Sequence, residues 1–92
     1  MNIPEKESEL LRLLYVAETS LSALLTERPQ SKYRYLTELF ARIRGATNQY
    51  VRNGDKNREF PDARNLYWDD PIDQLEAKCM ADAFKVFSFI RS

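Results

Sequence analysis

The chain has 92 residues, of which 43% are hydrophobic and 30% are charged, and 14 basic and 14 acidic residues give a formal net charge of zero. This length allows one domain, and a neutral charge is untypical of a dedicated nucleic-acid binder. Histidine is absent and Cys79 is the only cysteine. The composition therefore excludes Ser-His-Asp and Cys-His catalytic arrangements, an internal disulfide and a Cys/His zinc site. We expect a non-enzymatic protein without a cofactor or metal.

Neither the beginning of the chain nor its apolar runs resemble membrane or export segments. Residues 1–7 are polar and acidic, unlike a secretory signal. No apolar run approaches the roughly 20 residues that a membrane-spanning helix needs. The sequence thus favours a cytoplasmic protein with no membrane partner.

The first predicted helix spans about residues 4–28. Pro4 suits the first helical turn, and Pro29 ends the helix because the residue before a proline avoids the α region. Apolar residues then follow the heptad spacing that is typical of a packed helix face. They are Leu10, Leu14, Ala17, Leu21 and Leu24. This face packs either within the chain or against a second copy, so we expect a monomer or a homodimer.

The second predicted helix spans about residues 32–53. Ser31 is a suitable N-cap, and Gly54 follows the last residue, where glycine commonly terminates helices. Its apolar face has the same spacing, with Leu36, Phe40, Ile43, Thr47 and Tyr50. Gly45, in the middle of this helix, has two interpretations: a close approach of another helix, or simply weak local helicity.

A connection of residues 54–70 follows, and its second half is too apolar for a solvated linker. We expect a short helical turn near 62–66 and packing of this segment against the helices. Tyr67 and Trp68 are interpreted first as a plug over the end of the bundle and second as a contact for a partner protein.

The third predicted helix spans about residues 71–90. Asp70 is the expected N-cap, Pro71 takes the first helical position, and Asp73 lies three residues after the cap. One apolar stripe consists of Ile72, Leu75, Cys79, Ala83, Val86 and Ile90, beside a second stripe of Met80, Phe84 and Phe87. Residues 84–90 are rich in β-preferring side chains, so a terminal strand is the alternative.

These elements predict an all-α fold over residues 1–92, a small antiparallel three-helix bundle with a packed aromatic loop at 54–70. A helical hairpin crossed by the third helix is the alternative arrangement. Cys79 lies on the apolar stripe, which indicates a buried structural thiol.

Positive charge is concentrated between residues 31 and 58, a segment that contains seven basic residues and only two acidic ones. The flanking segments are acidic. Arginines interleaved with tyrosines are enriched at protein interfaces and also suit phosphates and unstacked bases. The candidate partner-binding residues are Arg34, Arg42, Arg44, Tyr50, Arg52, Lys56, Arg58, Tyr67 and Trp68. The structural alternative is that the arginines pair with the acidic first and third helices.

The leading hypothesis is a protein-interaction module that binds another protein or protein complex through these residues. A nucleic-acid-binding protein that uses segment 31–58 is the second hypothesis, and a dimeric helical structural or regulatory protein is the third. Phages and other mobile elements encode many small accessory proteins of this size, including inhibitors of host protein or ribonucleoprotein complexes. That comparison rests on size and composition alone.

Overall fold

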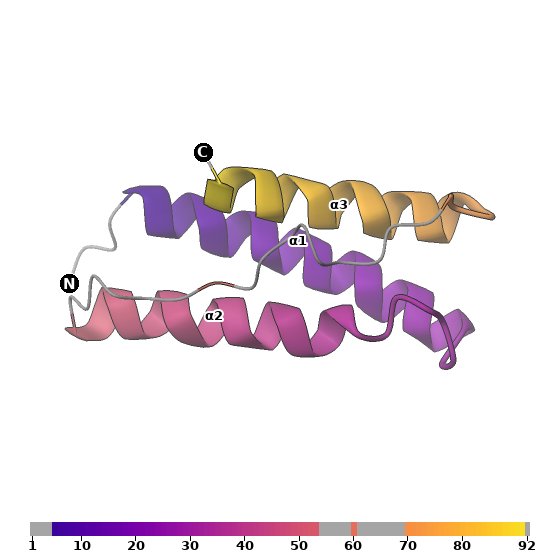
Figure 1. Ribbon diagram of the computed structural model, residues 1–92, viewed down its shortest axis with the longest axis horizontal. Helices are drawn as coiled ribbons and strands as arrows, with labels where there is room; N and C mark the ends of the chain where they lie inside the picture. The colour runs from indigo at the N-terminus through magenta and orange to yellow at the C-terminus, as the bar shows by residue number, and fades with distance from the viewer. Residues whose placement is uncertain (1–4, 54–59, 61–69, 92) are drawn as a thin grey trace.

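The computed structural model describes residues 5–53, 60 and 70–91 (Figure 1). They form three helices: α1 (Glu5–Glu27), α2 (Leu36–Asn53) and α3 (Gln74–Arg91). The predicted all-α three-helix bundle is confirmed. The alternative strand at 84–90 is wrong, because the helical stripe of α3 continues through this segment.

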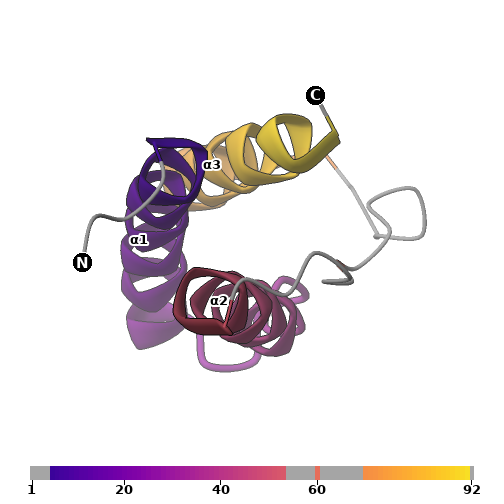
Figure 2. The same cartoon turned by 90° about the vertical axis from the view of Figure 1, so that its left-hand side faces the viewer.

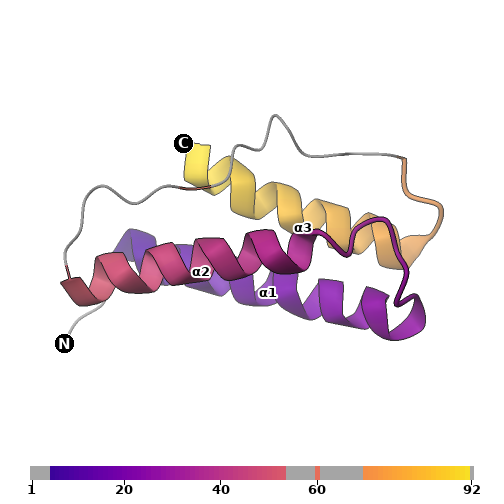
Figure 3. The ribbon, with the colours of Figure 1, turned by 60° about the horizontal axis from the view of Figure 1, so that its bottom comes forward.

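Helix α1 packs against both α2 and α3 (Figure 2). Both run antiparallel to α1, so α2 and α3 run in the same direction (Figures 1 and 3). The end of α2 and the start of α3 therefore lie toward opposite ends of the bundle, separated by about the length of α2, which is about 27 Å at 1.5 Å per residue. An extended chain needs about eight residues to cover that distance. This topology explains why the bundle needs a long connection between its second and third helices.

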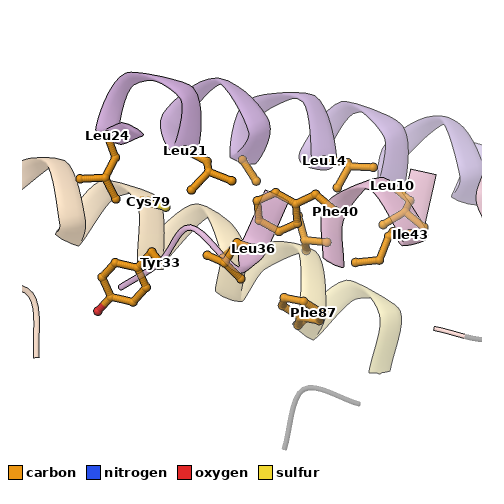
Figure 4. Packing of buried hydrophobic residues seen from close by; sticks show 13 residues of the cluster. Leu10, Leu14, Leu21, Leu24, Tyr33, Leu36, Phe40, Ile43, Cys79 and Phe87 are labelled. Atoms are coloured by element: carbon orange, nitrogen blue, oxygen red, sulfur yellow. The ribbon is translucent and has the colours of Figure 1, made fainter. Parts of the chain in front are cut away.

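The predicted apolar face of α1 forms the centre of the core (Figure 4). All five residues of its heptad pattern are buried, namely Leu10, Leu14, Ala17, Leu21 and Leu24. Burying a leucine side chain contributes about 1.5–3 kcal/mol relative to leaving it exposed. The face contacts both α2 and α3, which confirms the prediction that it packs within the chain.

The apolar face of α2 meets this core with Leu36, Phe40 and Ile43, all buried. Phe40 also contacts Phe87 of α3, with ring centroids 6.4 Å apart. Thr47 is buried as well, and its hydroxyl donates a hydrogen bond to the carbonyl oxygen of Ile43 at 2.8 Å. The aromatic pair thus joins α2 to α3 within the core.

The start of α2 differs from the prediction, because residues 32–35 form turns and the helix begins at Leu36. The Ser31 hydroxyl accepts a hydrogen bond from the backbone N–H of Tyr33 at 3.1 Å, two residues on. The backbone bond from Arg34 to Ser31, at 3.1 Å, spans three residues rather than four. Ser31 therefore caps a tight turn and not the helix. This turn buries Tyr33 completely in the core.

The start of α3 also differs, because Asp73 and not Asp70 caps the helix. The Asp73 carboxylate accepts the backbone N–H of Glu76 at 3.0 Å, and the Asp73 carbonyl accepts that of Ala77 at 3.0 Å. These two bonds define an N-cap. Ile72, predicted on the apolar stripe, precedes the helix and is 74% exposed.

Two other predictions have mixed outcomes. A Cβ atom added at Gly45 would meet no atom within 4 Å, so the described residues make no close approach there. In the connection, Phe60 is half-buried against the core, as expected for that residue. The predicted turn at 62–66 lies outside the described residues.

Candidate interaction surface

The nine candidate partner-binding residues have different positions in the structure. Arg34, Arg42 and Arg52 are exposed, whereas Arg44 and Tyr50 are half-buried. The remaining four candidates, Lys56, Arg58, Tyr67 and Trp68, lie outside the described residues. The basic segment thus contains both structural and exposed arginines.

Arg44 is a structural arginine that joins α2 to α1. Its guanidinium donates two hydrogen bonds to the carboxylate of Glu18, one of them from Nε to Oε2 at 3.2 Å. These bonds raise the pKa of Arg44 above its usual value, while partial burial opposes the rise. Two of the five donors of Arg44 are therefore used within the fold. Its role as a partner-binding residue stays a prediction.

Arg34, Arg42 and Arg52 differ from Arg44 in this respect. Within residues 5–53, 60 and 70–91, no ion pair joins any of these three to an acidic side chain. Arg34 lies on the turn before α2, and the other two lie on the solvent side of the helix. The structural alternative, pairing with the acidic helices, therefore applies to Arg44 but not to these three.

The exposed side of α2 is called the α2 outer face below. Its members are all exposed and comprise Glu38, Ala41, Arg42, Gly45, Asn48, Gln49 and Arg52. At 3.6 residues per turn they cover an arc of about 120°. Glu38 is the one acidic side chain among these seven, so the face has a net positive charge.

Acidic residues elsewhere are largely used within the fold. The Arg12 guanidinium binds Glu9 and lowers the pKa of that carboxyl, chiefly through a side-chain hydrogen bond. Glu18 binds Arg44. Because these internal pairs are neutral, a molecule of zero net charge can still present an unbalanced basic face.

A second ion-paired cluster fastens the turn before α2 to the start of α3. Arg28 pairs with Asp73 and, at 3.3 Å, with Glu76, whose carboxylate also lies 4.0 Å from the ammonium of Lys32. The Glu76 carboxylate additionally accepts the backbone N–H of Ile72 at 3.2 Å. This cluster was not predicted from the sequence, although the Asp73-x-x-Glu76 spacing resembles a capping box.

A buried polar contact joins α1 to α3 further along. The hydroxyl of Ser20 donates a hydrogen bond to the buried carboxylate of Asp82. Lys78 donates to the same carboxylate at 3.2 Å, and the ammonium of Lys85 lies 3.9 Å from it. Asp82 is thus fully engaged in holding two helices together, and sequence spacing alone did not indicate its partner on α1.

An open groove of about 430 Å³ lies between α1 and α2. Leucine and phenylalanine side chains form its apolar part, and hydroxyls and one carboxylate complete it. The lining residues are Glu18, Leu21, Ser22, Leu25, Thr26, Thr37 and Phe40. This groove was not predicted from the sequence, because it depends on the distance between two packed helix faces.

Chemically reactive groups are scarce in the part of the chain that the structure describes. Cys79 is buried, and burial, with smaller contributions from Asp82 and Glu76, raises the pKa of its thiol to about 11. A neutral buried thiol is a poor nucleophile. Within the same residues, no group of three or more Cys, Asp or Glu side chains could hold a metal ion. None of the described helices combines the length and the hydrophobicity that a membrane span requires.

No family model matches the chain, and neither a curated protein nor a solved structure shows significant similarity to it.

Proposed function

We propose that this protein is a non-enzymatic interaction module that binds an acidic surface of another protein through Arg34 and the α2 outer face. The observation that carries the proposal is the presence of three exposed arginines on α2 and the turn before it that have no acidic partner among the described residues. In contrast, Arg12, Arg28 and Arg44 are paired within the fold. An interface supplies the carboxylates that these guanidinium groups lack.

Physical chemistry favours a protein partner for these residues. Arginine is over-represented at interface hot spots, because its planar donor group binds carboxylates with two hydrogen bonds. A basic face also steers an acidic partner toward the correct surface and raises the association rate. The size and composition of the chain extend the proposal to regulation or inhibition of a larger protein or ribonucleoprotein complex, as small phage and mobile-element accessory proteins do.

Nucleic-acid binding is the second candidate. Asn48 and Gln49 are exposed between Arg42 and Arg52, and amide side chains of this kind can hydrogen-bond to bases. The zero net charge of the chain makes this candidate weaker. Such binding would weaken steeply as salt is raised.

Charge reversal on the α2 outer face tests the proposal. The double variant Arg42→Glu, Arg52→Glu should lose partner capture from a lysate of the native host by about tenfold or more, with its helical circular dichroism unchanged. Lys6→Glu with Arg91→Glu is the matched control, since both bases are exposed on other helices, and capture should persist.

Nuclease treatment of the same lysate separates the two candidates. Capture that survives nuclease and disappears in the double variant supports the protein-interaction module. If capture vanishes with nuclease, the second candidate replaces the first. Equal capture by the double variant and its control would rule out the α2 outer face as the binding surface.

A further inference from the structure

The groove between α1 and α2 adjoins the α2 outer face. Thr37 lines the groove and lies one turn after Arg34, to whose carbonyl its backbone N–H is bonded at 3.1 Å. Arg52 lies about 18 Å beyond Phe40 along the helix, at 1.5 Å per residue. The surface that runs along α2 from Arg34, past the groove, to Arg52 is called the path below. A basic side chain therefore lies near each end of this path.

On the α1 side of this path, the described residues that line the groove are leucines, hydroxyl residues and one ion-paired glutamate. Tyr15 lies one turn before Glu18, on the flank that also carries Ser22, and it is 67% exposed. Glu18 itself is neutralised by Arg44. An exposed tyrosine beside an apolar groove is the composition of an interface core, where aromatic residues are enriched and unpaired charges are depleted.

On the α2 side of the path, the exposed side chains next to the groove are small. Ala41 and Gly45 are exposed between the groove and the arginines, and a Cβ at Gly45 would meet no atom within 4 Å. Small side chains let a second helix approach to about 8 Å between axes. At that distance the long side chain of Arg42 can reach over the partner helix from its other flank.

We infer that an acidic amphipathic helix of the partner protein lies along α2, with an apolar side chain in the groove and its carboxylates on Arg34, Arg42 and Arg52. This inference rests on the proposed function and specifies the partner surface. Charge complementarity selects the occupant, because the exposed face that adjoins the groove carries arginines and one glutamate. A groove of about 430 Å³ is within the range of pockets that receive apolar groups.

A second copy of the chain is a poorer occupant. Among the described residues, the exposed carboxylates of Glu5 and Glu27 lie at opposite ends of α1, and that of Glu38 lies in the first turn of α2. They do not form an acidic stripe on one helix that could oppose the arginines.

The test is a selection from a displayed library of helical peptides of about 20 residues, which is the length that spans about 30 Å. Wild-type protein is the target, and binding of the enriched peptides is then measured to single variants. Thr37→Trp and Ser22→Trp fill the groove from α2 and from α1, and both residues are exposed. Ala23→Trp is the matched control, since Ala23 is exposed on α1 but does not line the groove.

We expect enriched peptides with an excess of Asp and Glu and with large apolar residues at i, i+4 spacing. Their affinity should fall about tenfold or more for Thr37→Trp and for Ser22→Trp, and change by no more than about twofold for Ala23→Trp. Circular dichroism establishes that each variant keeps its helices. Because the two groove variants change different helices, the test remains valid if one of them misfolds.

Other outcomes overturn the inference in distinguishable ways. In the first, acidic peptides bind both groove variants as tightly as wild type but lose binding to Arg42→Glu. That result would exclude the groove from the binding site and leave the proposed function intact. Two results together would remove both the inference and the proposed function. The selection would enrich no peptides, or only peptides without excess acid, and Arg42→Glu would have no effect on native partner capture. Sedimentation that shows a wild-type dimer, abolished by Thr37→Trp, would assign the groove to a second copy.

Discussion

The two sides of α1 are built differently. Toward α3, the helix is held by a buried hydrogen bond from Ser20 to Asp82, and the chain just after it by the Arg28 cluster. Toward α2, the Glu18–Arg44 pair lies beside an open groove. The α3 side thus satisfies polar groups through contacts within the fold, whereas the α2 side leaves an open, partly apolar groove beside the exposed α2 outer face.

This difference has a consequence for the register of the helices. Sliding α3 along α1 by one turn would separate the Asp82 carboxylate from the Ser20 hydroxyl and leave a buried polar group unsatisfied, at a cost of about 1–3 kcal/mol. A comparable slide of α2 would break a half-exposed ion pair, which contributes about 1 kcal/mol or less. The α3 side is therefore the more strictly specified contact.

The largest expected effect comes from Phe40, which belongs to the groove and to the shared core. Phe40→Ala should lower the free energy of unfolding by about 3–5 kcal/mol, because it removes a buried ring and its contact with Phe87. Urea unfolding followed by circular dichroism measures the loss. The exposed Tyr15→Ala should change stability by about 0.5 kcal/mol or less, and equal losses would contradict this assignment of the core.

The comparison between the two sides is tested directly by Asp82→Ala and Glu18→Ala. The first should cost about 1–3 kcal/mol, because Asp82 is buried and Ser20 and Lys78 lose their acceptor. The second should cost about 1 kcal/mol or less, since the Glu18–Arg44 pair is partly exposed. Double-mutant cycles with Ser20→Ala and Arg44→Ala measure each coupling energy, and a stronger Glu18–Arg44 coupling would reverse the comparison.

The helix cap on the α3 side gives a smaller effect. Asp73→Ala should lower stability by about 1 kcal/mol or somewhat more, because the N–H of Glu76 loses its acceptor and Arg28 loses a partner. Asp73→Asn keeps a capping oxygen and removes only the charge, so it should retain most of the stability. A full loss in Asp73→Asn would show that the ion pair, and not the cap, carries the effect.

Gly45 gives the smallest effect, on the α2 side and with the opposite sign. Gly45→Ala should raise the free energy of unfolding by about 0.5–1 kcal/mol, because alanine favours a helix interior and its Cβ meets no atom within 4 Å. Thermal unfolding measures the gain. A destabilised variant would mean that the glycine is required for the fold, in contrast to its exposed position on the α2 outer face.

Much of the fold could be predicted from the spacing of apolar residues. The heptad pattern from Leu10 to Leu24 and the stripe from Leu36 to Thr47 are buried as expected, since a helix brings residues three and four apart to one face. The starts of α2 and α3 were misplaced, by four and three residues. Cap signals compete over short distances: Ser31 could cap a turn or a helix, and both Asp70 and Asp73 precede helical residues.

The candidate site was predicted only in part, and the reason is physical. Composition and periodicity depend on one helix at a time, so they are enough to establish three helices, a basic second helix and a buried Cys79. Which arginine is paired depends on the rotation and register of two packed helices, which place Glu18 beside Arg44 and leave Arg42 and Arg52 on the solvent side. The groove between α1 and α2 has the same origin, because only packing decides where two apolar faces fail to close completely.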